Sequence, residues 1–274
     1  MSTFRPIVLI TGGSSGIGAA LARVFAENNH EVVLVARNGA QLDAVADDIG
    51  AHGLKRPHVL PIDLMRLDSG ARIGQELAAR GLEPAFIVNN AGFGLVGGAS
   101  VLDRAEQLDM IDLNIRALTD LSLRFVGSLQ RHRGGLLNVA SVAAFLPGAG
   151  MAVYYASKAY VLSFTEALHR ELEGKGVRVT ALCPGPVPTA FQDRAGMVLG
   201  GDRIVTLLSQ PAERVARAGY AGLMAGRRVV VPGFANKLVT VLVRFVPHSL
   251  LLRVADERQR KRKMSGTPWS QHPL

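Results

Sequence analysis

Short apolar runs rich in β-branched residues recur along the chain, and most are separated by longer stretches with helical character. The runs are 7–10, 32–35, 59–60, 86–88, 136–139, 177–182 and 229–231. The helical stretches include 19–28, 40–49 and 68–80. Strands that are apolar throughout are typical of a parallel sheet covered on both faces. With right-handed crossovers, the pattern predicts a doubly wound α/β fold with a seven-stranded parallel sheet, whose ligand site lies at the carboxyl ends of the strands.

The composition indicates a globular chain. Of 274 residues, 48% are hydrophobic and 19% are charged, which is enough apolar material for one large domain. Cys183 is the only cysteine and forms no internal disulfide, so we expect a reducing compartment such as the cytoplasm. No histidine pair has metal-ligand spacing, so we expect no metal site. The run 7–10 is too short for a signal peptide, and no stretch reaches the ~18 apolar residues of a membrane span.

The pattern changes after Gly233, which divides the chain into a domain of residues 1–233 and an extension of residues 234–274. The segment 238–246 is apolar, Pro247 interrupts it, and 250–252 resumes it, which predicts two short amphipathic helices. Six basic and two acidic residues follow in 253–263 and hold nearly half of the net charge of +9. We interpret them as a solvated tail and expect no nucleic-acid partner. Packing in a dimer or lid is favoured for the helices, with contact to an anionic membrane surface as the alternative.

A glycine-rich turn follows the first predicted strand. Residues 11–18 read Thr-Gly-Gly-Ser-Ser-Gly-Ile-Gly and open the first predicted helix. Glycines there allow a tight turn, a close approach to a pyrophosphate and close helix–strand packing. The free N–H groups at the start of a helix attract phosphate. We therefore predict a dinucleotide site, with contacts from Gly12, Ser14, Ser15, Gly16, Ile17 and Gly18.

The second predicted strand ends in Val-Ala-Arg-Asn, without the carboxylate that commonly binds the ribose 2′-hydroxyl of NAD. Arg37 at this position is suited to hold a 2′-phosphate through charge-assisted hydrogen bonds. The sequence therefore favours NADP(H) over NAD(H).

A tyrosine, a lysine and a serine form the candidate catalytic group. Tyr154 and Lys158 are four residues apart and lie on one helix face, although Tyr155, three residues from Lys158, satisfies the local geometry as well. Ser141 follows the predicted strand 136–139, at an end where ligands bind.

With these motifs in order, the chain resembles the short-chain dehydrogenase/reductase family over about residues 6–233. The resemblance implies a single-domain Rossmann fold and hydride transfer between NADP(H) and a ketone, aldehyde or alcohol. It selects Tyr154 over Tyr155 and implies a catalytic tetrad of Asn114, Ser141, Tyr154 and Lys158. Further cofactor contacts that it implies are Asp63, Leu64, Asn89, Ala91, Gly92, Pro184, Gly185, Val187 and Thr189, with Tyr154 and Lys158. Relatives form dimers or tetramers, and the extension is similar to that of bacterial members near the long-chain 3-oxoacyl reductases.

The expected chemistry assigns one task to each side chain. Tyr154 exchanges the proton, and Lys158, together with the positive charge of the oxidised nicotinamide, lowers the tyrosine pKa. Ser141 positions the substrate oxygen, and Asn114 holds a relay water. Apolar residues in a lid (189–211) and in the loop 93–96 favour an apolar substrate. The alternative is an NADPH-binding regulatory or sensor protein with little turnover.

Overall fold

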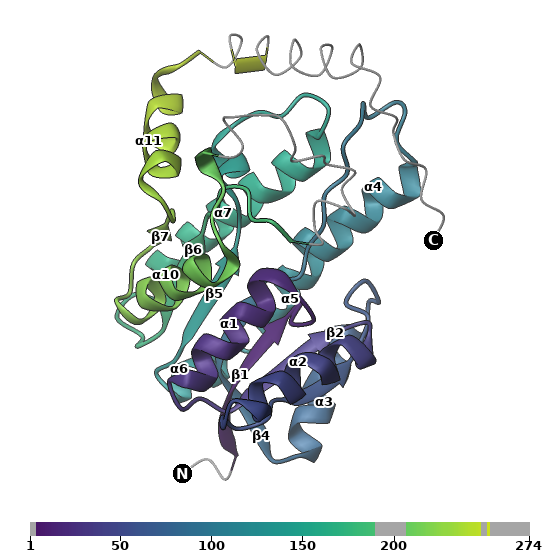
Figure 1. The fold of residues 1–274 in the computed structure, drawn as a ribbon, viewed down its shortest axis with the longest axis vertical. Helices are drawn as coiled ribbons and strands as arrows, with labels where there is room; N and C mark the ends of the chain where they lie inside the picture. Colours follow the sequence, from purple (N-terminus) through teal and green to yellow (C-terminus); the bar gives the residue numbers. More distant parts are fainter. Residues whose placement is uncertain (1–3, 190–206, 248–250, 253–274) are drawn as a thin grey trace.

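Seven parallel strands form one sheet in the computed structural model, which describes residues 4–189, 207–247 and 251–252 (Figure 1). The strand order is β3-β2-β1-β4-β5-β6-β7, so the chain winds outward from β1 in both directions. The strands are β1 (Arg5–Thr11), β2 (Val32–Ala36), β3 (His58–Pro61), β4 (Leu82–Asn89), β5 (Gly135–Val139), β6 (Arg178–Leu182) and β7 (Val229–Val230). The predicted doubly wound α/β fold with a seven-stranded parallel sheet is confirmed.

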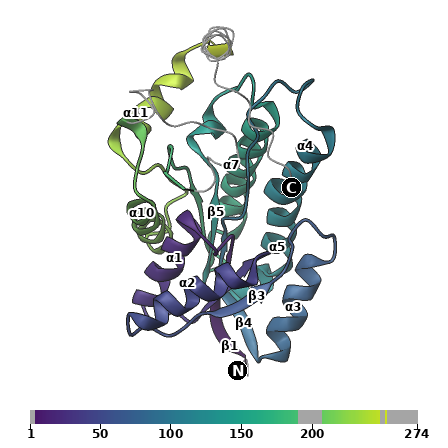
Figure 2. The same ribbon diagram turned by 45° about the vertical axis from the view of Figure 1, so that its right-hand side comes forward.

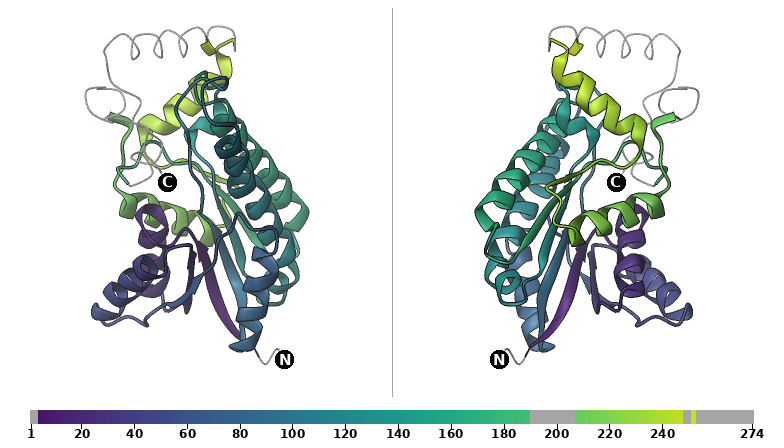
Figure 3. Two further views of the ribbon diagram at one scale, coloured as in Figure 1. Left: turned by 90° about the vertical axis from the view of Figure 1, so that its right-hand side faces the viewer. Right: turned by 90° about the vertical axis from the view of Figure 1, so that its left-hand side faces the viewer.

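Helices cover both faces of the sheet because successive strand residues point to opposite sides (Figures 2 and 3). In β1, Val8 and Ile10 pack with α1 (Gly16–Glu27), α2 (Gly39–Ala51) and α10 (Ala212–Met224). Ile7 and Leu9 face the other layer. That layer consists of α3 (Ser69–Ala79), α5 (Leu118–Arg124), α6 (Val126–Arg131) and α7 (Ala152–Leu172). Both clusters are almost fully buried, which explains why the strands are apolar on both faces.

The remaining helical segments connect these layers. Between β4 and α5 lie α4 (Arg104–Ile111) and a π-helical turn, η1 (Asp112–Ala117). A 3-10 turn, η2 (Val142–Phe145), precedes α7. Among the described residues, no helix is both long and apolar enough to cross a membrane.

The extension begins with a helix that differs from the predicted one. Helix α11 (Phe234–Leu242) starts four residues before the expected position 238, directly after Gly233, and a 3-10 turn, η3 (Val243–Phe245), follows it. Of the second expected helix only Leu251 and Leu252 lie within the described residues. The basic segment 253–263 and most of the expected lid, 190–206, lie outside them. The division of the chain at Gly233 stays a prediction.

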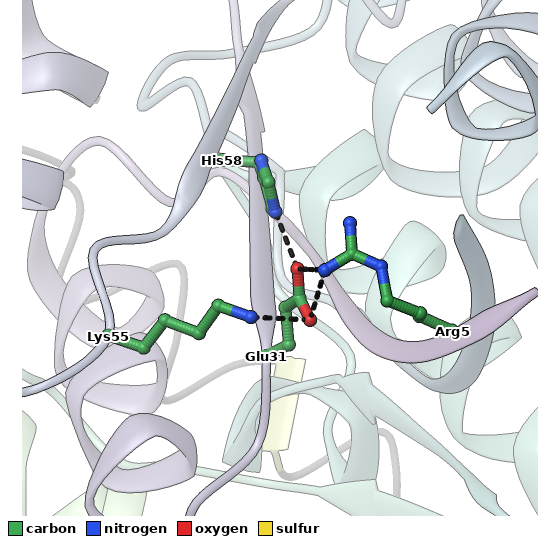
Figure 4. A network of polar contacts seen from close by, with 4 residues as sticks. All are labelled: Arg5, Glu31, Lys55 and His58. Atoms are coloured by element: carbon green, nitrogen blue, oxygen red, sulfur yellow. Dashed lines mark hydrogen bonds and ion pairs between the residues drawn. The ribbon is translucent and has the colours of Figure 1, made fainter. Parts of the chain in front are cut away.

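An ion cluster joins the amino ends of three strands, at the edge of the sheet opposite the predicted ligand site (Figure 4). Glu31, which precedes β2, accepts hydrogen bonds from Arg5 in β1 (3.0 Å) and from His58 in β3 (2.7 Å), and Lys55 lies 2.7 Å away. Although burial raises its pKa, the hydrogen bonds from Lys55 and His58 hold the pKa of Glu31 below its ordinary value. The cluster therefore adds ionic contacts between β1, β2 and β3 at their amino ends, beside the backbone pairing of the sheet.

Candidate active site

A cavity of about 520 Å³ opens at the carboxyl ends of the parallel strands. It brings together most of the residues singled out from the sequence. These are Gly12, Ser14, Ser15, Gly16, Ile17, Arg37, Asp63, Leu64, Ala91, Gly92, Ser141, Tyr154, Lys158, Pro184, Gly185, Val187 and Thr189. Gly18, Asn89 and Asn114 are absent from the lining and lie behind it. The cavity lies where a doubly wound sheet is expected to bind its ligand.

The glycine-rich turn forms one end of the cavity. Gly12 has a positive φ of 64°, and a Cβ on Gly18 would lie 2.1 Å from the Gly12 carbonyl oxygen, so neither position accommodates a larger residue without strain. Helix α1 starts at Gly16, and its N-cap residue Ser15 makes no side-chain capping bond. The first N–H groups of α1 therefore have no side-chain cap at the end of the helix that lines the cavity.

Asn90 holds this turn, a role that sequence reasoning missed. Its Nδ2 donates to the carbonyl oxygens of Thr11 and Gly12, both at 3.1 Å. The family resemblance implies a cofactor contact at the neighbouring Asn89, which stays a prediction. Asn89 is buried, and its Nδ2 donates to Ser122 Oγ (3.0 Å) and Asn138 Oδ1 (2.9 Å). Asn89 is the last residue of β4, and Asn90 is the first residue after it, where the chain leaves the strand and reaches the turn.

Arg37 lies at the rim of the cavity, directly after β2, with its side chain exposed. The next residue, Asn38, caps α2 by accepting a hydrogen bond from the Gln41 N–H (3.1 Å). Among the described lining residues only Asp63 is acidic, and its Oδ1 accepts from the Met65 N–H (3.1 Å). This end of the cavity therefore offers a guanidinium and amides to an anionic group.

Tyr154 and Lys158 lie one turn apart on α7, and both line the cavity. Lys158 Nζ lies 5.9 Å from the centre of the Tyr154 ring and donates to the Val139 carbonyl oxygen at 2.9 Å. Ser141, at the start of η2, accepts a hydrogen bond from the Ala143 N–H (3.1 Å) and is hydrogen-bonded to Tyr154. The end of β5 and the first turns of α7 thus bring a hydroxyl, a phenol and an ammonium to one wall.

Burial shifts the pKa values of both groups on α7. Desolvation raises the pKa of Tyr154 to about 12, and a hydrogen bond with Ser141 offsets it only in part. Desolvation also lowers the pKa of Lys158 to about 8. The direction for Tyr154 is opposite to the lowered pKa expected for the oxidised complex. That expectation depends on the charge of a nicotinamide as well as on Lys158, and in the structure burial has the largest effect on the Tyr154 pKa.

Asn114 is buried within η1 and braces the wall that carries Tyr154. Its Nδ2 donates to the Phe93 carbonyl oxygen (2.9 Å) and to Ser157 Oγ (3.0 Å), and its Oδ1 accepts from the Phe93 N–H (3.1 Å). Ser157 Oγ donates in turn to the Tyr154 carbonyl oxygen (2.7 Å). A π-turn widens the helix at this point, a deviation that recurs at functional sites. No sequence pattern indicated it.

Tyr155 also lines the cavity, so local geometry keeps both tyrosines near the site. The two rings meet edge to face with centroids 6.0 Å apart, and a Cβ on Gly148 would lie 2.2 Å from the Tyr155 ring. Tyr155 thus packs against the loop before α7, whereas Tyr154 is hydrogen-bonded to Ser141. Apolar side chains also line the cavity: Phe93, Leu113, Val142, Leu146 and Met151.

A doubly wound sheet whose cavity is lined by the glycine-rich turn before α1 and by a serine, a tyrosine and a lysine defines a dinucleotide-dependent oxidoreductase. Residues 6–197 match the family model of the short chain dehydrogenases, which is well over half of the chain. The chain belongs to the short-chain dehydrogenase family and is an oxidoreductase.

Several proteins of this family are similar to the chain. The NADP-dependent 3-hydroxy acid dehydrogenase of Salmonella typhi is 35% identical over 185 residues, which cover 66% of this chain and 72% of the relative. A short-chain dehydrogenase from Sphingobium yanoikuyae, solved in complex with NADPH, is 29% identical with a TM-score of 0.75 and covers 98% of this chain and 99% of its own. The bulky-bulky ketone specific alcohol dehydrogenase from Comamonas testosteroni is 25% identical with a TM-score of 0.71, covering 99% and 98%.

Proposed function

We propose that the protein is an NADP(H)-dependent oxidoreductase that interconverts a ketone or aldehyde and an alcohol. The observation that carries this proposal is the shared wall on which Ser141, Tyr154 and Lys158 meet, in a cavity that begins at the first turn of α1. When bound, the cofactor supplies or accepts the hydride. The chain's own residues hold the substrate oxygen and move the proton.

In this proposal, Tyr154 donates its phenolic proton to the substrate oxygen during reduction, and Ser141 donates a hydrogen bond to the same oxygen. A phenol with a pKa of about 12 keeps its proton firmly, so the charge of Lys158 is needed to ease its release. The hydrogen bond from Lys158 Nζ to the Val139 carbonyl oxygen supports this role, because it holds the ammonium group near the Tyr154 ring. Asn114 supports the same wall through Phe93 and Ser157.

We assign the preference for NADP(H) to Arg37, which lies at the cavity rim and whose guanidinium would pair with a 2′-phosphate. The phosphate contacts proposed for Gly12, Ser14, Ser15, Gly16 and Ile17 lie at the start of α1. The relative from Salmonella typhi is named NADP-dependent, and the one from Sphingobium yanoikuyae was solved with NADPH, which agrees with this preference.

We propose an apolar substrate, because Phe93, Val142, Leu146 and Met151 line the same cavity as Tyr154. The lid residues that entered this expectation, within 190–206, lie outside the described part of the chain.

We also propose that the protein acts in the cytoplasm as a homodimer or homotetramer. The single cysteine, Cys183, is buried, which suits a reducing compartment.

The proposed assembly rests on exposed apolar side chains. Large ones are exposed on α4, α5 and α7, and these helices form one side of the molecule (Figure 2); they are Leu108, Ile111, Leu123 and Tyr160. Light scattering on the purified protein would measure a dimeric or tetrameric mass; a monomer at micromolar concentration would contradict this assembly.

The test of the function is NADPH oxidation, followed by absorbance, with ketones and aldehydes of increasing chain length and with NADH in parallel. We expect turnover with NADPH that increases with apolar chain length. Tyr154→Phe should abolish turnover while NADPH affinity stays nearly unchanged, and Tyr155→Phe is the matched control. Wild-type rates in Tyr154→Phe would overturn the assignment of the proton donor. Tight NADPH binding without turnover on any carbonyl would instead favour the regulatory or sensor protein.

The cofactor preference has its own variant. Arg37→Ala should weaken NADPH binding by about tenfold or more and leave NADH binding little changed, because only the 2′-phosphate is lost as a partner. Arg72→Ala, an exposed arginine on α3 outside the cavity, is the control. Equal losses for NADPH and NADH would contradict the role of Arg37.

A further inference from the structure

The loop between β3 and α3, residues 62–68, forms part of the cavity wall, and its residues 62–65 line the cavity. Two hydrogen bonds shape this loop from within. Asp63 Oδ1 accepts from the Met65 N–H (3.1 Å), and Ser69 Oγ at the start of α3 donates to the Leu64 carbonyl oxygen (3.4 Å). Both bonds join residues that are close in sequence, so they do not by themselves place the Met65 end of the loop against the layer of helices behind it.

Arg116 makes that long-range contact. Its Nη2 donates to the Met65 carbonyl oxygen at 2.6 Å, across 51 positions of the chain. Its Nε donates to Asp112 Oδ1 at 2.8 Å, one turn earlier in the same helical segment. Because the guanidinium is planar and its donors are fixed relative to one another, two bonds made at once hold its orientation. One side chain thus anchors the loop 62–68 to η1.

The same π-helical turn also carries Asn114, two residues before Arg116. Asn114 bonds to Phe93 and to Ser157, on the side of the cavity that holds Tyr154. Arg116 bonds to Met65 instead, and both Phe93 and Met65 line the cavity. The turn η1 therefore supports the cavity at two separate places, and a role in catalysis alone would need only the first of them.

We propose that Arg116 is a positioning residue for the cofactor, which holds the loop 62–68 in the conformation that binds the dinucleotide. This role rests on the proposed NADP(H)-dependent function and on the cofactor contacts expected from Asp63 and Leu64. Arg116 itself is outside the cavity lining and acts through the Met65 carbonyl. A loop that is ordered before the ligand arrives loses less entropy on binding, so the anchor increases affinity.

The position of the anchor also predicts which part of the cofactor it serves. The 2′-phosphate is assigned to Arg37, which follows β2, whereas the anchored loop follows β3. Arg116 should therefore affect the portion that NADPH and NADH share, and its loss should weaken both cofactors by the same factor. Arg37→Ala, in contrast, should weaken NADPH alone.

The test is fluorescence titration of the full chain with NADPH and with NADH. Arg116→Met keeps an apolar stem and removes the donors, so the dissociation constants of both cofactors should rise by about five- to tenfold. Without cofactor, hydrogen exchange at the Met65 and Arg66 amides, which both bond within the loop, should become faster in this variant. Arg116→Lys keeps a cationic donor, which makes it a second and milder variant with a smaller loss in the same direction.

The matched control is Arg124→Met. Arg124 forms the same kind of pair with Asp120, four residues earlier at 2.9 Å, but lies outside the cavity lining. This control should bind both cofactors like the wild type, and the two methionine variants should have similar melting temperatures, because each loses one such pair.

Three results would overturn the role of Arg116 while leaving the proposed function intact. They are wild-type affinity and loop exchange in Arg116→Met, a loss of affinity for NADPH alone, and a loss that Arg124→Met shares. A wild-type chain that binds neither NADPH nor NADH would instead overturn the proposed function, and the role of Arg116 with it.

Discussion

Asn236 lies directly behind Gly185, so that a Cβ on Gly185 would be 2.4 Å from the Asn236 Oδ1 and 2.6 Å from its Nδ2. The amide has little freedom to move, because its Nδ2 donates to Leu208 and Pro232. The glycine is therefore required by the close approach of the extension to the cavity wall, and the two parts of the chain are coupled at this contact.

Gly185→Ala should lower the free energy of unfolding by about 1–3 kcal/mol and weaken NADPH binding, because the new methyl group overlaps a fixed side chain. Asn236→Ala in the same chain should recover part of this loss, since it vacates the space. Chemical denaturation and NADPH titration of the single and double variants measure the coupling. Gly74→Ala, with no atom within 4 Å of the new Cβ, is the control that should not destabilise. Strictly additive effects would show that the two residues do not compete for space.

Lys158 should make the protein more stable as the pH rises from 8 to 10. Burial lowers its pKa from 10.5 to about 8, so in this range the unfolded chain binds a proton that the folded chain has released. This difference in pKa between the unfolded and the folded chain corresponds to a cost of roughly 3 kcal/mol for keeping the buried ammonium charged at pH 7. Lys158→Met should therefore be inactive yet more stable than the wild type by about 1–2 kcal/mol at pH 7, after the loss of the bond to Val139 is subtracted.

Denaturation at several pH values checks this sign, with the advantage of Lys158→Met expected to shrink toward pH 10. Above pH 10 the raised pKa of Tyr154 acts in the other direction, because the folded chain then keeps a proton that the unfolded chain loses. If the free energy of unfolding of the wild type does not rise relative to that of Lys158→Met between pH 8 and 10, the pKa of Lys158 is not lowered.

Asn114→Ala should destabilise the protein by about 2–4 kcal/mol, because it leaves the Phe93 N–H, the Phe93 carbonyl and Ser157 without their buried partner. The rate of turnover should fall as well, since Ser157 bonds to the backbone of Tyr154. Asn28→Ala, which removes a single bond to the Val24 carbonyl at the far end of α1, should cost less than about 1 kcal/mol. If Asn114→Ala has the same free energy of unfolding as Asn28→Ala and keeps the wild-type rate of turnover, then Asn114 does not support the wall that carries Tyr154.

Glu31→Gln should lower the free energy of unfolding at pH 7 by about 1–2 kcal/mol, because it weakens the contacts of Arg5, Lys55 and His58 at one point. The pKa of Glu31 is held below its ordinary 4.5, so its stabilising contribution is present above that pH and is lost as the pH falls through the lower folded value. The difference between wild type and variant should accordingly shrink in acid. Glu76→Gln, which removes an exposed pair with Arg80, should change stability by less than about 0.5 kcal/mol. A difference between Glu31→Gln and the wild type that is constant with pH would rule out the ionised cluster as its source.

Much of the fold and of the site follows from local sequence patterns. Seven apolar runs predict the strands, because a strand covered on both faces must be apolar on both. The glycines of 11–18 predict the turn before α1, because backbone conformation and close packing at Gly12 and Gly18 depend on the residue itself. Ser141 reaches the cavity because it follows β5 at the edge where the carboxyl ends of the parallel strands meet, and Tyr154 and Lys158 lie one turn apart near the start of α7.

Other properties depend on residues distant in sequence, and the tertiary structure alone decides them. Asn90 and not Asn89 reaches the turn, because Asn89 is buried at the end of β4 while Asn90 follows it beside the end of β1. Desolvation by surrounding segments raises the pKa of Tyr154 where its near neighbour Lys158 suggested a decrease. The amphipathic pattern of α11 identifies an apolar face, but the bonds of Asn236 to Leu208 and Pro232 turn that face to the outside. Sequence records which residues are apolar or charged, and packing determines what each of them contacts.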